Sequence, residues 1–223
     1  MEEFDPFGWL ETYITAQIIH LLIRISIIAV LTVFLFQRVS SYDLYMVKPL
    51  WVAETLVFIT FLVSYLIRKD PVCRSRGVKE IIVPLIGGIL PFALLFSPPN
   101  LLLSVSPFAL NIIFYWMTAA TVLTVWGLWT LKRSFSITVE ARDLVTNGPY
   151  RFIRHPIYLG EMLTALAVAF WRFSLLNLFI FTLFVVIQLF RAKWEEEKLV
   201  KVFPDYKKYS LLSLWPWGNA DKK

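Results

Sequence analysis

Residues 144–160 concentrate polar side chains and turn residues in an otherwise apolar chain. They read Leu-Val-Thr-Asn-Gly-Pro-Tyr-Arg-Phe-Ile-Arg-His-Pro-Ile-Tyr-Leu-Gly. Asn147-Gly148-Pro149 predicts a turn, and Pro156 suits the first turn of a following helix. The free N–H groups at the start of that helix carry partial positive charge and could hold a carboxylate or a ribose hydroxyl. Because unpaired polar groups are costly in hydrocarbon, the stretch must lie at a membrane surface or line a polar cavity.

Four side chains in and just after this stretch could either line a ligand cavity or serve only the local structure. Tyr150 and Tyr158 offer flat faces suited to an adenine ring or a sulfonium cation. The equally consistent alternative is that His155 caps the helix and the tyrosines form an interfacial belt. Glu161 follows Tyr158 by one helical turn, so it either lines the same cavity or bonds locally.

A second polar cluster begins at Arg191. Arg191 and Glu195 are four residues apart and share one face of a predicted helix. Taken alone, they predict an ordinary ion pair, worth a few tenths of a kcal/mol. The sequence Phe-Pro-Asp-Tyr-Lys-Lys-Tyr follows at 203–209.

The elements that position these clusters are apolar helices. The chain of 223 residues is 58% hydrophobic with a mean hydropathy of +0.65, which predicts a single-domain, all-α integral membrane protein. The short fifth and sixth segments are separated only by Arg172-Phe173-Ser174 and predict a tight helical hairpin. Pro84, Gly87, Gly88 and Pro91 predict either a kink in the third segment or a close approach by a neighbouring helix. The six apolar segments are 17–36, 50–67, 80–97, 108–131, 157–171 and 174–190.

The basic residues predict the orientation. They cluster in the loops 68–79 and 132–156 and in the tail after 190, which six spans bring to one side of the membrane. The positive-inside rule makes that side cytoplasmic, so the protein is predicted to be multi-pass with its active site facing the cytoplasm. The net charge of +6 lies in these short clusters, a pattern that argues against nucleic acid as a partner. The acidic segment 1–17 predicts an interfacial helix rather than a signal peptide.

Polar residues also occur inside the first two apolar segments. Gln17, His20 and Arg24 share one helix face, and Glu54 in the second segment is the expected partner of Arg24. These residues predict either a substrate or proton path or a structural ion pair near the interface. The sequence leaves open whether His20, Arg24 and Glu54 contact substrate.

The chain offers few ligands for a metal. It has one cysteine, Cys73, and two histidines, so no internal disulfide and no metal site are expected.

The two polar clusters together resemble the isoprenylcysteine carboxyl methyltransferase family. The matching patterns are Gly-Pro-Tyr-Arg-x-x-Arg-His-Pro-x-Tyr-x-Gly, a short hairpin, Arg-x-x-x-Glu-Glu and Phe-Pro-x-Tyr-x-x-Tyr. The resemblance covers about 130–210, with a weaker match at 131–136, and extends to a wider group of membrane methyltransferases that includes phospholipid N-methyltransferases. It implies a methyltransferase core over 131–210, followed by a tail over 211–223. Residues 1–130 show no family signature, and their apolar segments predict N-terminal transmembrane helices. One departure is Arg142-Asp143, where the isoprenylcysteine enzymes often have a histidine.

The resemblance also implies a cofactor and roles for individual residues. The cofactor is S-adenosylmethionine, with S-adenosylhomocysteine as product, in a cytoplasmic pocket near the C-terminus. Arg191 matches an arginine assigned to the methyl acceptor, and Glu161 is added as a candidate substrate residue. Arg191 and Glu195 are the predicted catalytic residues. The residues that match cofactor-binding positions are Leu144, Val145, Tyr150, His155, Pro156, Ile157, Tyr158 and Glu195.

The expected acceptor is a lipophilic molecule that enters from the bilayer. A carboxylate is already ionised at neutral pH and needs a cation such as Arg191 to place it. An amine would instead need a base, with Glu161, Glu195 or Glu196 available. Arg191 favours an isoprenylcysteine-type carboxylate, with a phospholipid amine of the phosphatidylethanolamine type or another small hydrophobic acceptor as alternatives. An NADPH-dependent sterol-type reductase and a non-enzymatic lipid-binding scaffold are the competing classes, and oligomeric state is left open.

Overall fold

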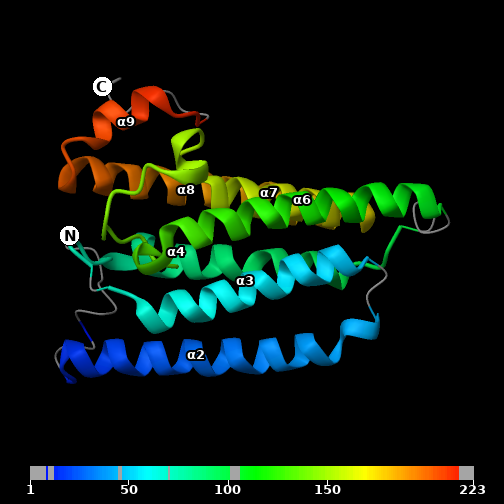
Figure 1. Cartoon of the computed structure of the whole chain (residues 1–223), viewed down its shortest axis with the longest axis horizontal. Helices are drawn as coiled ribbons and strands as arrows, with labels where there is room; N and C mark the ends of the chain where they lie inside the picture. The colour runs from blue at the N-terminus through cyan, green and yellow to red at the C-terminus, as the bar shows by residue number, and fades with distance from the viewer. Residues whose placement is uncertain (1–8, 10–12, 45–46, 70, 101–105, 216–223) are drawn as a thin grey trace.

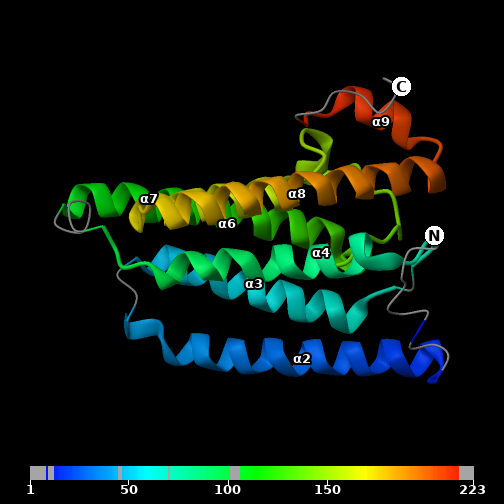
Figure 2. The same ribbon diagram turned by 180° about the vertical axis from the view of Figure 1, so that it is seen from behind.

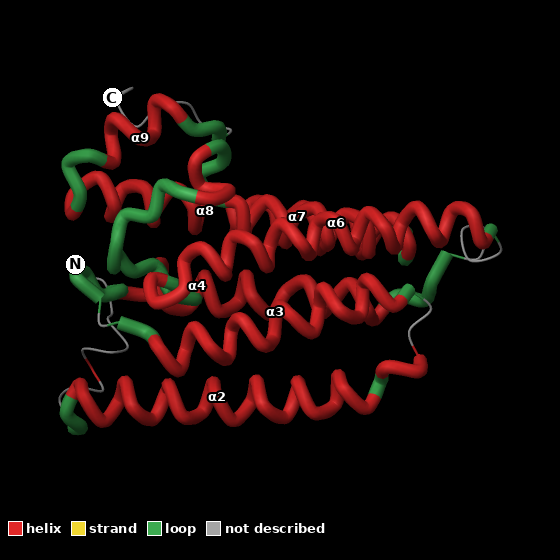
Figure 3. The backbone as a smooth tube through the Cα atoms, viewed as in Figure 1, coloured by secondary structure: helices red, strands yellow, loops and turns green. Residues whose placement is uncertain are grey.

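The computed structural model describes residues 9, 13–44, 47–69, 71–100 and 106–215. The regular secondary structure in that part of the chain is helical apart from two isolated β-bridges, and loops join the helices. The long helices run side by side in one bundle, and the chain runs back and forth along the length of this bundle (Figures 1 and 3). Three short turns of 3-10 helix lie between them: η1 (Tyr42–Leu44), η3 (Lys132–Ser134) and η4 (Gly148–Arg151). The main elements are α2 (Ala16–Ser40), α3 (Lys48–Ile67), α4 (Gly77–Ile89) continued by η2 (Leu90–Phe96), α6 (Pro107–Leu131), α7 (Pro156–Trp171), α8 (Leu175–Val202) and α9 (Tyr206–Leu212).

Four described segments are long and apolar enough to cross a membrane: Lys48–Ile67, Gly77–Phe96, Pro107–Ser134 and Leu175–Val202. A chain can cross hydrocarbon as helices because their backbone groups bond within the segment. Each of the six predicted apolar segments corresponds to a helix or to a helix with its 3-10 extension. The first predicted segment corresponds to α2 and the fifth to the 16-residue α7, and neither helix is among the four candidate spans. A count of six membrane spans therefore stays a prediction.

The third segment changes its helix type as its prolines and glycines predict. Pro84 lies within α4, and the α-helix gives way to 3-10 helix at Leu90, beside Pro91. Gly87 faces α8 so closely that an added Cβ would lie 2.9 Å from Cγ2 of Ile187. The glycine therefore sets the approach of α4 to α8.

The hairpin of α7 and α8 is confirmed. Its turn is held by Asn177, whose buried amide donates to the carbonyls of Leu94 (3.0 Å) and Arg172 (2.7 Å). The Ser174 side chain caps α8 by accepting from the Asn177 backbone N–H. These bonds hold the hairpin turn against the end of η2.

The expected pairing of Arg24 with Glu54 is wrong. Glu54 forms an ion pair with Arg38, and Arg24 donates to the carbonyl of Leu66. Since α2 and α3 run antiparallel, the start of α2 lies beside the end of α3, and Glu54 near the start of α3 meets the end of α2 (Figure 2). The side chains of Gln17 and His20, and residues 1–8 and 10–12 of the expected interfacial helix, lie outside the described residues.

The basic loops meet at one end of the bundle, here called the site end. The segment after α3 pairs with the segment after η3, because Cys73 and Ala141 exchange backbone hydrogen bonds of 3.0 and 3.1 Å. The last turns of α8 and the whole of α9 lie at the same end (Figure 1). The predicted grouping of the basic regions on one side is therefore confirmed, whereas the cytoplasmic identity of that side stays a prediction.

Candidate functional site

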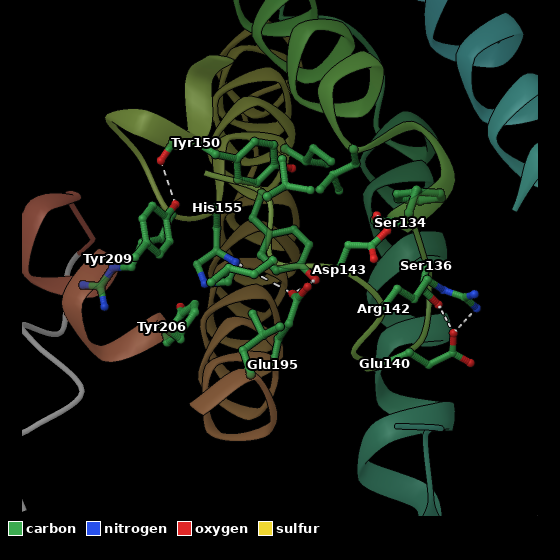
Figure 4. Close-up of a pocket in the computed structure, with 18 residues that line it drawn as sticks. Ser134, Ser136, Glu140, Arg142, Asp143, Tyr150, His155, Glu195, Tyr206 and Tyr209 are labelled. Carbon is green, nitrogen blue, oxygen red and sulfur yellow. Dashed lines mark hydrogen bonds and ion pairs between the residues drawn. The ribbon is translucent and has the colours of Figure 1, made fainter. Parts of the chain in front are cut away.

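A cavity opens at the site end between α6, α7, α8 and α9. It holds about 720 Å3 of space, part of it open to solvent. Figure 4 shows its labelled side chains in two groups, which we call the aromatic lobe (Tyr150, His155, Glu195, Tyr206 and Tyr209) and the polar lobe (Ser134, Ser136, Glu140 and Arg142). Asp143 lies between the two lobes.

The turn at 147–149 and the start of α7 carry the first wall of the cavity. Gly148 has φ +56, a conformation that favours glycine, and an added Cβ would lie 2.8 Å from the Thr130 hydroxyl. Pro156 occupies the first turn of α7, as predicted, and His155 precedes it at the N-cap position. The His155 side chain makes no capping hydrogen bond, so the alternative in which it caps the helix is wrong.

His155 is instead held by a carboxylate that the sequence reasoning did not assign. Its Nε2 lies 3.0 Å from Oε1 of Glu196, and Arg154 donates to the other oxygen at 3.1 Å. All three side chains are buried. The adjacent pairs Arg154-His155 and Glu195-Glu196 in the two motifs could have suggested this contact from the sequence. Only the fold shows which of the two glutamates is buried.

Tyr158 links the aromatic lobe to the middle of the bundle. Its hydroxyl donates to Oε2 of Glu195 at 2.9 Å, and its ring lies parallel to the His155 ring at 5.3 Å. The guanidinium carbon of Arg191 lies 4.8 Å from the centre of the same ring. Glu195 keeps 29% of its side-chain surface exposed and forms no ion pair with an arginine or lysine among the described residues. It is therefore the acidic group of this lobe that is open to a ligand.

The tyrosines of the aromatic lobe stay neutral at physiological pH. Burial raises the pKa of Tyr209 to about 12, and it raises the pKa of Tyr150 and of Tyr206 well above the usual range. The hydroxyl of Tyr209 donates to the carbonyl of Tyr150 at 2.6 Å. This bond ties α9 to the turn that begins the site.

Arg191 and Glu161 lie deeper than predicted, outside the lining of the cavity. Arg191 donates to Oε1 of Gln188 at 2.6 Å and to the carbonyl of Ile137 at 3.0 Å, and Gln188 donates to Glu161. Gly87 leaves room for these hydrogen-bonded side chains, since an added Cβ would lie 3.4 Å from Cδ of Arg191. The expected substrate residues thus form one buried polar chain behind the cavity.

The predicted cofactor residues are brought together, with one exception. Pro156 is buried, with its Cγ 3.4 Å from where a Cβ on Gly127 would lie, so it packs against α6. The others line the cavity: Leu144, Val145, Tyr150, His155, Ile157, Tyr158 and Glu195. Their roles toward a cofactor stay predictions.

The polar lobe is carried by residues 134–143, which α8 holds in place. The buried ammonium of Lys198 donates to the carbonyl of Val139 at 2.9 Å and to Glu80 at 2.5 Å. Arg191 donates to the carbonyl of Ile137. Within the lobe, Arg142 pairs with Glu140 at 2.5 Å. The sequence did not predict that these residues form part of the site, although it noted the Arg142-Asp143 departure and the weak match at 131–136. The groups that hold the lobe in place, such as Arg68 and Lys198, come from distant parts of the chain.

Comparison with known proteins supports a methyltransferase. Residues 99–206 match the family model for phospholipid methyltransferases. No curated protein matches the chain. The matched range includes every lining residue of the cavity except Tyr209. The match supports an integral membrane methyltransferase that acts on lipid, within the wider group that the motifs indicated. It does not single out the isoprenylcysteine family.

Proposed function

We propose that the protein transfers a methyl group from S-adenosylmethionine to a lipid acceptor. The observation that carries the proposal is the aromatic lobe, which lies almost wholly within the matched range and combines flat rings, a helix N-terminus and a partly exposed carboxylate. Four described segments are also long and apolar enough to cross a membrane, which suits an enzyme whose substrate lies in the bilayer.

The residues present fit S-adenosylmethionine. Glu195 can accept hydrogen bonds from ribose hydroxyls or from the ammonium group, and Tyr150 and Tyr158 can cover the adenine or the sulfonium. When bound, the cofactor supplies an electrophilic methyl group. His155, held by Glu196, sets the position of the Tyr158 ring, and the Tyr158 hydroxyl orients Glu195. Positioning and exclusion of water can supply much of the acceleration of such a displacement.

The contacts around Glu195 favour an amine acceptor. The neighbouring guanidinium groups are already engaged, that of Arg191 with Gln188 and Ile137 and that of Arg154 with Glu196. A carboxylate acceptor would have to displace one of these bonds or rely on the buried Nε of Arg191. An amine needs a base, and Glu195 is a partly exposed carboxylate without a lysine or arginine partner among the described residues. We therefore place a phospholipid amine of the phosphatidylethanolamine type first.

An isoprenylcysteine-type carboxylate is the second candidate. The Nε of Arg191 is buried and makes no hydrogen bond to the described residues, so one donor remains available behind the cavity. Two-pronged recognition of a carboxylate by an arginine would use such a donor.

Methyl transfer in nanodiscs tests the reaction and the acceptor together. Purified protein would receive S-adenosylmethionine with a radiolabelled methyl group and either phosphatidylethanolamine or a farnesylcysteine analogue. We expect base-stable label on the phospholipid. Base-labile label on the prenylcysteine would instead establish a methyl ester and return the acceptor role to Arg191. Binding of NADPH with no binding of S-adenosylhomocysteine would reject the methyltransferase in favour of a reductase.

A further inference from the structure

The polar lobe holds more positive charge than its one buried carboxylate can neutralise. Arg68 and Arg142 both donate to Oε2 of Glu140, at 2.6 and 2.5 Å. Burial alone would raise the pKa of Glu140, but the two guanidinium groups and the Ser136 hydroxyl lower it below its usual value. The carboxyl is therefore ionised at neutral pH, and the cluster of two cations and one anion has a net charge of +1.

Several donors of this cluster have no acceptor. Nε and Nη1 of Arg142 and Nε of Arg68 are buried without a hydrogen-bond partner among the described residues. Arg142 keeps only 5% of its surface exposed and also lines the cavity. A buried charged donor without an acceptor is strongly unfavourable, and a ligand that supplied the acceptor would remove this cost.

The side chains nearby suit an oxyanion. Ser134 and Ser136 line the same lobe, but their hydroxyls donate to Asp143 at 3.0 Å and to Glu140 at 2.9 Å. The donors left for a ligand are those of the guanidinium groups, which are the usual partners of carboxylate and phosphate. Asp143 also lies here, but it is exposed and already paired with Lys69 at 2.8 Å. Its charge acts mainly on Lys69 and less on Arg142, and adding this pair of opposite charges to the cluster leaves the net charge at +1.

We infer that the polar lobe is an oxyanion subsite, with Arg142 as its principal donor. The inference rests on the proposed function for the identity of the anion. A ligand that spans both lobes could bring either of two groups: the amino-acid carboxylate of the methyl donor or the phosphate of a phospholipid acceptor. Both groups are oxyanions that accept hydrogen bonds from the Arg142 guanidinium, and binding measurements distinguish them.

The first pair of measurements compares ligands that differ only in the anion. Calorimetry in detergent would measure S-adenosylhomocysteine against its decarboxylated analogue, and a short-chain phosphatidylethanolamine against a phosphate-free ethanolamine ether. We expect wild-type protein to prefer the anionic member of one pair by at least tenfold. Arg142→Gln should abolish that preference while leaving the affinity for the member without the anion within about twofold. The pair that responds identifies the source of the anion.

Two further variants control for charge and folding. Arg133→Gln removes one exposed cation from η3 at the same end of the molecule and should leave both preferences unchanged. Arg142→Lys keeps the buried charge and should retain part of the preference, so it serves if Arg142→Gln does not fold. Preferences that are equal in wild type and Arg142→Gln, or lost equally in Arg133→Gln, would overturn the subsite.

Inorganic phosphate separates failure of this inference from failure of the proposed function. Phosphate should raise the melting temperature of wild type and not that of Arg142→Gln, whether or not the protein binds a methyl donor. A phosphate effect without any binding of S-adenosylhomocysteine would keep the subsite and reject the methyltransferase. Binding of S-adenosylhomocysteine with no effect of Arg142→Gln on any anion would do the reverse.

Discussion

At the residue scale, two adjacent carboxylates of α8 have different surroundings. Glu196 is buried between Arg154 and His155, whereas Glu195 faces the cavity with 29% of its side chain exposed. Removing one partner of a buried ion pair leaves the other charge uncompensated. The two positions therefore separate support of the site from contact with a ligand.

We predict that Glu196→Gln destabilises the protein far more than Glu195→Gln. Loss of the Glu196 charge removes the buried carboxylate that Arg154 and His155 both contact, a change of about 3–5 kcal/mol. Thermal unfolding in one detergent, with Glu195→Gln as the matched variant, measures the difference. Equal melting temperatures would show that the buried bridge adds little to stability.

A second prediction concerns the division of roles within the site. His155→Ala and Glu195→Ala should each weaken binding of S-adenosylhomocysteine, because both side chains line the cavity. Arg191→Ala should reduce turnover more than cofactor affinity, since Arg191 lies behind the Tyr158 ring. Calorimetry and single-turnover rates test this division, which an equal loss of affinity in all three variants would contradict.

The Glu140 cluster predicts a dependence of stability on pH. The folded pKa of Glu140 lies below its ordinary value of 4.5, so its stabilising contribution is complete above pH 4.5 and is lost as the pH falls through the folded pKa. The melting temperature should drop with acidification in this range, and Glu140→Gln should flatten the drop. Asp143→Asn is the control, because that exposed carboxyl also has a lowered pKa but should change the profile less. A profile unchanged in Glu140→Gln would exclude the cluster as its cause.

At the scale of elements, the site depends on a close contact between α6 and α7. A Cβ added at Gly160 would lie 2.8 Å from the carbonyl oxygen of Ala120 and would clash with the Thr124 hydroxyl. Gly127 allows the same approach near the start of α7, where an added Cβ would lie 2.8 Å from Cγ1 of Ile157. Small residues at such crossings let helix backbones pack closely in a membrane. The position of His155 at the start of α7 follows from this contact.

We predict that Gly160→Ala destabilises the protein by about 1–3 kcal/mol, as overpacking of a closed contact does. Gly88→Ala is the matched control, because an added Cβ there meets nothing within 4 Å and alanine favours a helix. Thermal unfolding should lower the melting temperature of the first variant and leave that of the second equal or higher. A greater loss in Gly88→Ala would mean that the glycines act through something other than the α6 contact.

At the scale of the whole molecule, the two ends of the bundle differ in charge and in content. The site end carries the basic loops, the cavity and α9, whereas the other end carries η1 and the turn of the α7–α8 hairpin (Figure 1). The positive-inside rule predicts that the site end faces the cytoplasm, where S-adenosylmethionine is available. The free cysteine at the site end, Cys73, allows a direct test.

We predict that a membrane-impermeant maleimide labels Cys73 in inside-out vesicles and not in intact cells. Asp43→Cys in a Cys73→Ser background should give the opposite result, because Asp43 is exposed in η1 at the far end. Labelling of Asp43→Cys from the cytoplasmic side would invert the proposed orientation.

The sequence alone determined the helical membrane architecture, the hairpin and the turn before α7. These features depend on apolar run length and on local proline and glycine chemistry, so nearby residues specify them. It also identified most residues that line the aromatic lobe, since their motifs are short and contiguous.

Only the tertiary structure decided which charged groups meet. Glu54 pairs with Arg38 because antiparallel packing sets the register of α2 against α3. The rotation of α8 places Glu196 closer to His155 than Glu195, at 3.0 Å against 3.7 Å. The polar lobe joins Arg68 to Glu140 across 72 positions of sequence. No local pattern encodes such a pairing, because it depends on how distant segments approach when the helices pack.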